Sequence, residues 1–500
     1  MTDSFPSQIH SDDRRIAVVS GTRWTSFGEV VSQILRVVTY VLLARLLAPR
    51  DFGLLAMALV ITNFIDVIRD LGTRSAIIQK RDVSRELASS IFILNIGIAV
   101  VVTAVLVAIA PLVGELFETP DVIPVLRVMC IAIGIGALGL VQQGLLYRAM
   151  QFSAIAVALI SGAVSQAIVA LTMGALGFGV WALVAGIISG AFVTTLLLWI
   201  ASGWRPFVHF AWSDIRGVAS FSLNVTGVRV LNFFVNDVDK FVVGRALGAA
   251  ALGIYSMGWR IVSQILTVTG RVLQQVLFPT LSAIQDDNEK VRRDFLRTMS
   301  VVALVFFPIM VGIATVADVF VRVVLGADWI PAIPLMTILA LLGPIQISVW
   351  GASILFQAKG RADWMLRWRI VSGLAIVAAY FVGVRWGLNG VVLAFAAVVV
   401  ALAYPSLAIP FRLIRLGFRE FAMQMAPYIL ACAAMGSVVL MLQRALDWFG
   451  WGDPGVLLSS IVLGAAVYGV FIWWYRPASW SDLMTLIRPG SSTLEISGGA

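Results

Sequence analysis

Residues 86–116 read ELASSIFILNIGIAVVVTAVLVAIAPLVGEL, and their only charged members, Glu86 and Glu115, stand near the two ends. A helix needs about 20 apolar residues to cross the hydrocarbon core of a membrane, so this run is long enough to span it. Of the 500 residues in the chain, 60% are hydrophobic and only 13% are charged. This composition excludes a soluble globular domain and predicts a chain whose main solvent is lipid.

Similar apolar runs recur from Thr22 to Trp474. In hydrocarbon, only helices and closed barrels satisfy every hydrogen-bonding group of the backbone. The runs are too long for barrel strands and lack their strict alternation, so the sequence predicts an all-α polytopic membrane protein with about 14 transmembrane helices. The expected spans are 22–47, 51–71, 86–116, 122–147, 153–175, 178–201, 215–245, 251–283, 298–325, 331–357, 365–384, 387–411, 420–443 and 455–475.

The positive charges predict the orientation of these spans. If the N-terminus is cytoplasmic, most Lys and Arg fall in cytoplasmic loops, and the opposite loops hold only Arg45, Arg50, Arg127, Arg245, Arg322, Arg385 and Arg444. The positive-inside rule then places both termini in the cytoplasm. The net charge of +9 follows from this topology, so it calls for no nucleic-acid partner, and anionic membrane lipids suffice as partners of the basic loops.

An internal repeat relates the two halves of the chain. A shift of 200 residues, without a gap, pairs Val38 with Val238, Arg45 with Arg245, Leu47 with Leu247, Gly53 with Gly253, Met57 with Met257, Ile61 with Ile261 and Ile65 with Ile265. An even number of spans separates the copies, which predicts parallel repeats around a central cavity. We expect six-helix lobes over 22–202 and 203–416, cytoplasmic tails at 1–21 and 477–500, and two additional helices within 417–476.

Polar side chains recur inside the first, seventh and eighth spans. A charged side chain at the centre of a span costs about 2.5–3.5 kcal/mol on insertion scales, so such residues indicate a partner or a wet cavity. Steps of three and four residues place them on one face of each helix. The substrate-cavity candidates are Glu29, Gln33, Arg36, Arg229, Asn232, Asn236, Lys240, Arg260, Gln264 and Arg271. Arginine favours a phosphate-bearing ligand, and the amides suit sugar hydroxyls.

Four carboxylates are candidates for ion coupling or for a gate: Glu29, Asp66, Asp70 and Asp239. Glu29 is the repeat equivalent of Arg229, so these two side chains could pair across the pseudo-axis as a gate. The alternative is structural, because charges inside a membrane also pair to hold helices together. Arg69 could pair with Asp66 and Asp70 in this way, and Asp237, Asp239 and Lys240 could neutralise one another. The sequence leaves both interpretations open.

Motifs for catalysis or cofactor binding are missing from the sequence. Gly134, Gly136 and Gly139 spell GxGxxG, but they lie in an apolar span without a preceding strand, which indicates close helix packing. Neither His10 nor His209 has a plausible catalytic or metal-binding partner. We therefore expect no cofactor, no metal and no enzymatic activity.

Several segments carry a family resemblance. Leu43-Ala-Arg-Leu-Leu-Ala-Pro-Arg-Asp-Phe-Gly53, Asp70-Leu-Gly72 and Ile78-Gln-Lys-Arg81 lie in the first half, and the second half has Asp239-Lys240, Gly244-Arg245, Leu247-Gly248, Leu252-Gly253, Tyr255, Phe278-Pro279, Gln285-Asp286 and Ala358-Lys-Gly-Arg361. With these segments the chain resembles Wzx-type oligosaccharide flippases of the polysaccharide transport family, within the multidrug/oligosaccharidyl-lipid/polysaccharide exporter superfamily.

The resemblance implies a task. It implies a flippase of the bacterial inner membrane that moves undecaprenyl-diphosphate-linked oligosaccharide outward by alternating access, for exopolysaccharide, capsule or O-antigen synthesis, beside polymerase and glycosyltransferase partners. A pyrophosphate would need the cations listed above, and the sugars would need the polar groups. Two alternatives use the same scaffold: a flippase for another lipid-linked precursor and an ion-coupled multidrug exporter. A third is a non-transporting membrane scaffold of a glycan-synthesis complex.

Overall fold

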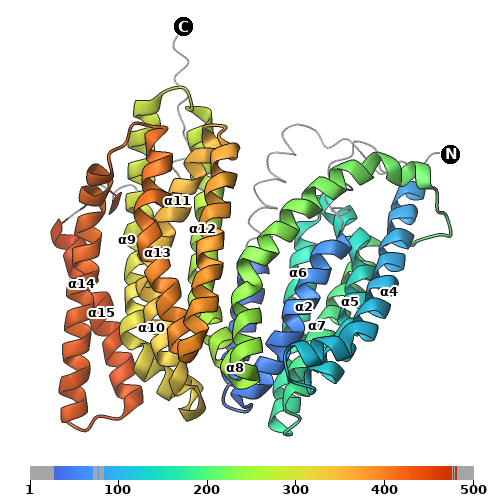
Figure 1. The fold of residues 1–500 in the computed structure, drawn as a ribbon, viewed down its shortest axis with the longest axis horizontal. Coiled ribbons are helices and arrows are strands. Elements are labelled where there is room, and N and C mark those ends of the chain that lie inside the picture. The colour runs from blue at the N-terminus through green and yellow to red at the C-terminus, as the bar shows by residue number, and fades with distance from the viewer. Residues whose placement is uncertain (1–27, 71–76, 78–83, 476, 478, 481–500) are drawn as a thin grey trace. The chain divides into compact units, whose positions relative to one another are not determined.

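The computed structural model describes residues 28–70, 77, 84–475, 477 and 479–480, and the regular elements in this part are helices (Figure 1). A first helix covers residues 28–43. It is followed by α2 (Pro49–Asp70), α4 (Arg85–Leu116), α5 (Val122–Arg148), α6 (Phe152–Ala175), α7 (Val180–Ser202), α8 (Trp212–Ala283), α9 (Asn288–Phe320), η1 (Val321–Leu325), η2 (Ala327–Ala332), α10 (Ile333–Leu341), α11 (Gly343–Ala358), α12 (Ala362–Gly383), η3 (Val384–Trp386), α13 (Gly387–Arg412), α14 (Phe418–Trp448) and α15 (Asp453–Tyr475). These helices follow the predicted spans in order and confirm the fold class.

Length and apolarity agree with membrane crossing. Within the described ranges, nine helical stretches are long and apolar enough to span a membrane, and α10 with α11 would add one bent span. One of these stretches, Ala362–Arg412, contains 51 residues, which is enough for two passes.

A glycine divides α8 into two spans. Gly248 has φ 82° and ψ −179°, a conformation outside the helical region that other residues rarely adopt. The chain reverses there, so the predicted spans 215–245 and 251–283 are the two arms of one helical hairpin.

The predicted span 331–357 differs in detail from the structure. Instead of one straight helix, α10 and α11 meet at a bend of 43°. Pro344 stands in the first turn of α11, where its missing N–H and its ring cannot continue the preceding helix. The span is therefore broken near its middle.

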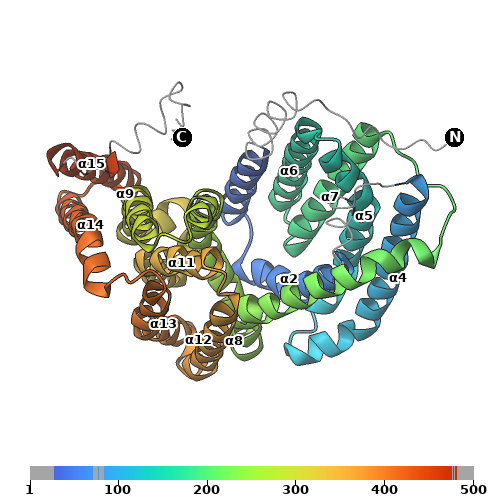
Figure 2. The same ribbon diagram turned by 90° about the horizontal axis from the view of Figure 1, so that it is seen from above.

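The chain forms two compact units, Met1–Ser256 and Met257–Ala500. In the first unit, α7 packs against both α5 and α6, and α4 packs against α5 (Figure 2). Small residues allow a close approach of α6 and α7: a methyl group added at Gly190 would lie 2.9 Å from the carbonyl oxygen of Gly162. Ser189 Oγ also donates to the carbonyl oxygen of Ser165 at 3.4 Å.

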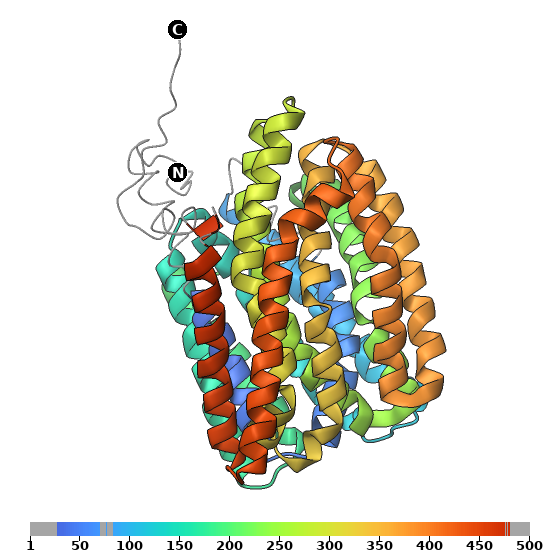
Figure 3. The same cartoon turned by 90° about the vertical axis from the view of Figure 1, so that its left-hand side faces the viewer.

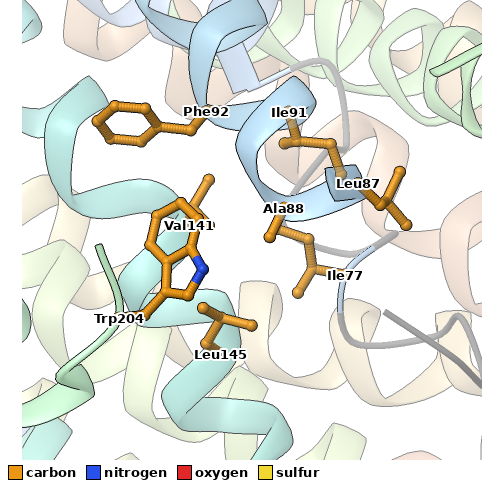
Figure 4. Packing of buried hydrophobic residues seen from close by; sticks show 8 residues of the cluster. All are labelled: Ile77, Leu87, Ala88, Ile91, Phe92, Val141, Leu145 and Trp204. Carbon is orange, nitrogen blue, oxygen red and sulfur yellow. The ribbon is translucent and has the colours of Figure 1, made fainter. Parts of the chain in front are cut away.

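A buried apolar cluster joins α4 and α5 to the segment after α7. It contains Ile77, Leu87, Ala88, Ile91, Phe92, Val141, Leu145 and Trp204 (Figure 4). Phe92 meets the Trp204 ring edge to face, with 5.8 Å between the ring centroids. Ser84 begins α4 by accepting a hydrogen bond from the backbone N–H of Leu87, so this helix starts where its cluster residues start.

In the second unit, the two additional helices α14 and α15 pack on α9 (Figure 3). Polar contacts fix them there: Gln443 Nε2 donates to the carbonyl oxygen of Thr315 at 3.2 Å, and Tyr468 Oη donates to that of Leu304 at 3.0 Å. Hydrogen bonds of this kind replace the hydrophobic driving force that helices lack in lipid. The helices outside the predicted repeat are thus integral to the second unit.

The connection between the first helix and α2, which we call the tip, is fixed by specific contacts of Ala48, Pro49 and Asp51. Pro49 occupies the first position of α2, which suits its fixed φ and missing N–H. The Asp51 carboxylate accepts from the backbone N–H of Ala48 at 3.2 Å and from that of Val180 at 3.0 Å. One side chain therefore caps the beginnings of both α2 and α7.

The start of α2 packs against the bend of α8 so closely that no side chain fits between the two backbones. A methyl group at Gly53 would overlap the carbonyl oxygen of Ala249, and one at Gly253 would overlap that of Pro49. Under the 200-residue shift, position 49 is equivalent to 249 and position 53 to 253. The contact is therefore reciprocal, as around a two-fold axis, and it supports the repeat found in the sequence.

Candidate functional site

The polar residues of the first helix lie away from its exposed apolar face. Val30, Ile34, Val38 and Leu42 are each about half exposed and follow one another at steps of four. At 100° per residue, the face of Glu29, Gln33 and Arg36 lies about 150° from this apolar stripe. Glu29 is exposed, whereas Gln33 and Arg36 are half-buried. The helix therefore presents two distinct surfaces, one suited to lipid and one polar.

The polar stripe ends at Tyr40. This residue is buried, and its ring lies 6.1 Å from that of Phe52 on α2, centroid to centroid. The hydroxyls of Ser32 and Thr39 donate to the carbonyls of Gly28 and Leu35 of the same helix.

Several predicted site residues have side chains outside the described part. Arg229, Asn232 and Asn236 lie on the first arm of α8, and Asp66 and Asp70 lie at the end of α2, where the helices themselves are described. The cavity role of the first three, the role of the two carboxylates and the pairing of Glu29 with Arg229 all stay predictions.

The structure brings together charged groups on the first arm of α8. Lys240 Nζ lies 2.5 Å from Asp237 Oδ1. Asp239 is only 3% exposed, and its Oδ2 accepts a hydrogen bond of 2.7 Å from the hydroxyl of Tyr255 on the second arm. The bond between Asp239 and Tyr255 joins the two arms, and the ion pair between Lys240 and Asp237 lies within the first arm, so both contacts are structural. A role in ion coupling stays a prediction.

The second arm of α8 carries a polar band in the second unit. Arg260 and Gln264 are half-buried, and Thr267, Arg271 and Gln274 are exposed. The exposed apolar residues of this arm, Val268, Val272 and Val276, form a separate stripe about 120° away around the helix. The predicted candidates Arg260, Gln264 and Arg271 therefore share one face.

The structure adds two residues of α11 that the sequence analysis missed. Gln274 Nε2 donates to Gln357 Oε1 at 3.1 Å. The Trp350 ring lies against Gly270, since a methyl group there would be 2.9 Å from Cζ3 and 3.0 Å from Cε3. Trp350 and Gln357 stand seven residues apart, two helical turns, and this spacing was the available signal.

Lys359 links the end of α11 to the loop that follows α8. Its Nζ donates to Asn288 Oδ1 at 2.6 Å and to the carbonyl oxygen of Gln285. Burial lowers the pKa of Lys359, and the nearby Asp286 and Asp287 oppose this effect. Gly360 next to it has φ 65°, which explains the glycine in the Ala358-Lys-Gly-Arg361 motif.

Several residues that carry the family resemblance have structural roles. Asp51 caps two helices, Gly53 and Gly253 lie at the crossing, and Arg245 forms an ion pair of 2.8 Å with Glu118. Asp239 joins the two arms of α8. The described residues contain no group of three or more His, Cys, Asp or Glu that could hold a metal ion.

The helical order and the polar faces define the class: a polytopic membrane protein with transporter architecture. The solved structure "Lipid II flippase MurJ, inward closed conformation" is similar, with a TM-score of 0.69 at 15% identity, over 92% of this chain and 99% of that chain. At this identity the similarity shows the fold.

The family follows from the sequence. Residues 42–334 match the family model described as "Polysaccharide biosynthesis protein", and this is more than half of the chain. The chain therefore belongs to that family, which confirms the resemblance inferred from its motifs.

Curated relatives agree with the family. The chain is 26% identical over 388 residues to "Lipopolysaccharide biosynthesis protein WzxC" of Escherichia coli (strain K12), covering 76% of this chain and 78% of that protein. It is also 26% identical over 459 residues to "Succinoglycan biosynthesis transport protein ExoT" of Rhizobium meliloti (strain 1021), covering 91% and 92%.

Proposed function

We propose that this protein is a flippase that moves polyprenyl-diphosphate-linked oligosaccharide across a bacterial inner membrane by alternating access. The observation that carries the proposal is the polar band on α8, where arginines and amides share one face of a membrane-spanning helix in a polysaccharide biosynthesis protein. Arginine pairs with pyrophosphate oxygens, and amides bind sugar hydroxyls. The names of the relatives, which mention lipopolysaccharide biosynthesis and succinoglycan transport, support the same substrate class.

The proposal includes a binding site and a topology. The substrate cavity would be lined by the candidates on the first helix and on both arms of α8, within six-helix lobes over 22–202 and 203–416. Both termini would be cytoplasmic, because most basic loops would then face the cytoplasm. The chemistry would be transport without catalysis, and the polymerase and glycosyltransferases of the same pathway would be its partners.

The alternatives predict other chemistry at these positions. An exporter of cationic drugs would favour carboxylates and aromatic rings on the polar faces, whereas Arg36, Arg260 and Arg271 dominate here. A non-transporting scaffold would gain nothing from charges that are costly to place in a membrane. A flippase for another lipid-linked precursor would use the same chemistry. Only the identity of the precursor that accumulates without the protein distinguishes it from the proposed function.

The test is a complementation experiment. Cells that lack the protein should accumulate lipid-linked oligosaccharide on the cytoplasmic face, and the wild type should relieve this. Arg36→Ala and Arg271→Ala, one in each unit, should reduce export by about tenfold or more at matched expression, because each loses a charge-assisted contact with the substrate.

Arg369→Ala is the matched control, because this exposed arginine lies on α12 outside the polar faces, and export should be unchanged. Without any accumulation of precursor in the deletion strain, the proposed function fails. Full complementation by both alanine variants of the polar faces would instead reject only the proposed site.

A further inference from the structure

The ring of Trp350 is partly exposed and packs against a glycine of the neighbouring helix α8. Its side chain lies on α11, the second half of the bent span formed by α10 and α11, and the residue is 40% exposed. Gly270 on α8 lets the ring approach the helix backbone, since a methyl group there would be 2.9 Å from ring atom Cζ3. The indole is therefore held against one helix while part of it remains open.

Polar residues stand near Gly270 and Trp350 on both α8 and α11. Around the second arm of α8, Gly270 lies about 80° from the centre of the polar band, on the side away from the exposed valines. Arg271 follows Gly270 in the chain and is exposed, and Gln274 reaches across to Gln357 on the same helix as Trp350. A tryptophan that served only as lipid contact would have apolar neighbours on this side.

The amide pair retains hydrogen-bonding capacity. Each amide has two N–H donors and a carbonyl oxygen with two lone pairs, and the bond from Gln274 to Gln357 uses one donor and one lone pair. Hydroxyl groups of a ligand that lay on the indole would find donors and acceptors beside it. Arg271 adds a charged donor to the same surface.

An aromatic face, a cation and amides together match the chemistry of a sugar ring. The face of an indole carries partial negative charge, and the C–H bonds on the flat side of a pyranose carry partial positive charge, so the two stack while hydroxyls point sideways to polar groups. A pyrophosphate alone would need no such platform.

We propose that the indole of Trp350 is the platform on which a sugar ring of the transported substrate stacks, with Arg271, Gln274 and Gln357 binding its hydroxyls. This inference rests on the proposed function and assigns the sugar-recognition part of its site. It separates the two demands of the substrate: Trp350 and its neighbours recognise the sugar, and the pyrophosphate binds at the other candidate arginines.

The test compares two probes that differ only in the sugar. Binding of undecaprenyl diphosphate and of undecaprenyl diphosphate carrying one glucose is measured on the purified full-length protein. Trp350→Ala should weaken binding of the glucosylated probe by about tenfold and leave the bare probe unchanged, because one aromatic contact is lost. Trp350→Phe, which keeps an aromatic face, should lose clearly less.

Two further variants control the experiment. Gly270→Ala should reproduce part of the loss, because its methyl group displaces the ring. Trp473→Ala removes a tryptophan on α15 that is 71% exposed, and it should change neither affinity. Each variant is first compared with wild type by elution profile and melting temperature, so that a folding defect is recognised.

The outcomes separate the two proposals. Equal loss for both probes in Trp350→Ala, or no loss for either, overturns the platform while the proposed function stands. If wild-type protein binds neither probe, the proposed function fails and the platform fails with it. Selective loss for the glucosylated probe alone supports the platform.

Discussion

The helix tips of the first unit and the polar band of the second differ in how their residues are packed: the tips are closely packed, and much of the band is exposed. At the tips, Gly53 and Gly253 lie against backbone carbonyls with no room for a methyl group, and Asp51 caps two helices. In the band, Arg271 and Gln274 are exposed, as is Trp350 on the neighbouring helix α11. Three residues of the family motifs, Asp51, Gly53 and Gly253, lie at the tips, and several candidate ligand groups lie in the band. The quoted motif residues at the tips therefore stabilise the scaffold, while the residues that we propose for substrate recognition lie outside those motifs.

The largest effect is expected from breaking the glycine crossing. Gly253→Ala would place a methyl group on the carbonyl oxygen of Pro49, and Gly53→Ala would place one on that of Ala249. Because backbone atoms cannot move aside cheaply, each variant should lose about 3 kcal/mol or more of stability. The measurement is the yield of monodisperse protein and its melting temperature.

Gly134→Ala is the matched control for this experiment. Gly134 lies in α5 with nothing within 4 Å of the added methyl group. Alanine also favours a helix over glycine, so this variant should be neutral or slightly more stable. A wild-type melting temperature for Gly253→Ala would show that the crossing is looser than the structure indicates, and the contrast between the two regions would weaken.

An intermediate effect is expected at the shared cap. Asp51→Ala removes the acceptor for the backbone N–H groups of Ala48 and Val180, which should cost about 1–2 kcal/mol. Asp51→Asn keeps one acceptor oxygen and should lose less. Thermal unfolding of the three proteins in the same detergent measures the order. Equal stability of wild type and Asp51→Ala would show that Asp51 does not stabilise the starts of α2 and α7.

The smallest effect concerns a loop outside the membrane. Asp287 precedes α9 and accepts hydrogen bonds from the backbone and the side chain of Lys290 and from the backbone N–H of Glu289, and these bonds, those from Lys290 above all, lower the pKa of its carboxyl. A carboxyl with a lowered pKa in the folded state stabilises the protein above its unfolded pKa, about 3.9, and this contribution disappears as pH falls through the folded value.

The expected result is a difference in melting temperature between wild type and Asp287→Ala that is constant near neutral pH and shrinks below about pH 4. Thermal unfolding of both proteins at a series of pH values measures it. A difference that stays constant down to the lowest pH would mean that the charge of Asp287 does not contribute.

Most of the fold could be predicted from the sequence, because lipid imposes a simple rule. Apolar runs of sufficient length must be helices, and this rule gave the order of the spans, including the division of α8 near Gly248. The bend between α10 and α11 was missed, because a proline near a helix start is compatible both with a new helix and with a kink in a longer one.

The candidate site was predictable in part. Steps of three and four residues placed Arg260, Gln264 and Arg271 on one face, and the structure agrees with that geometry. Helical periodicity cannot show which other helix packs beside such a face. Trp350 and Gln357 are distant in sequence from α8, so only packing brought them to Gly270 and Gln274.

The sequence by itself determined the membrane class, the order of the helices, the repeat and the family, since each depends on local composition or on spacing along the chain. The tertiary structure decided what the repeated glycines do, which helices Asp51 caps, and which side chains border the polar band. These depend on contacts between segments such as α2 and α8, or α8 and α11, and no local pattern in a chain specifies the partner of a helix face.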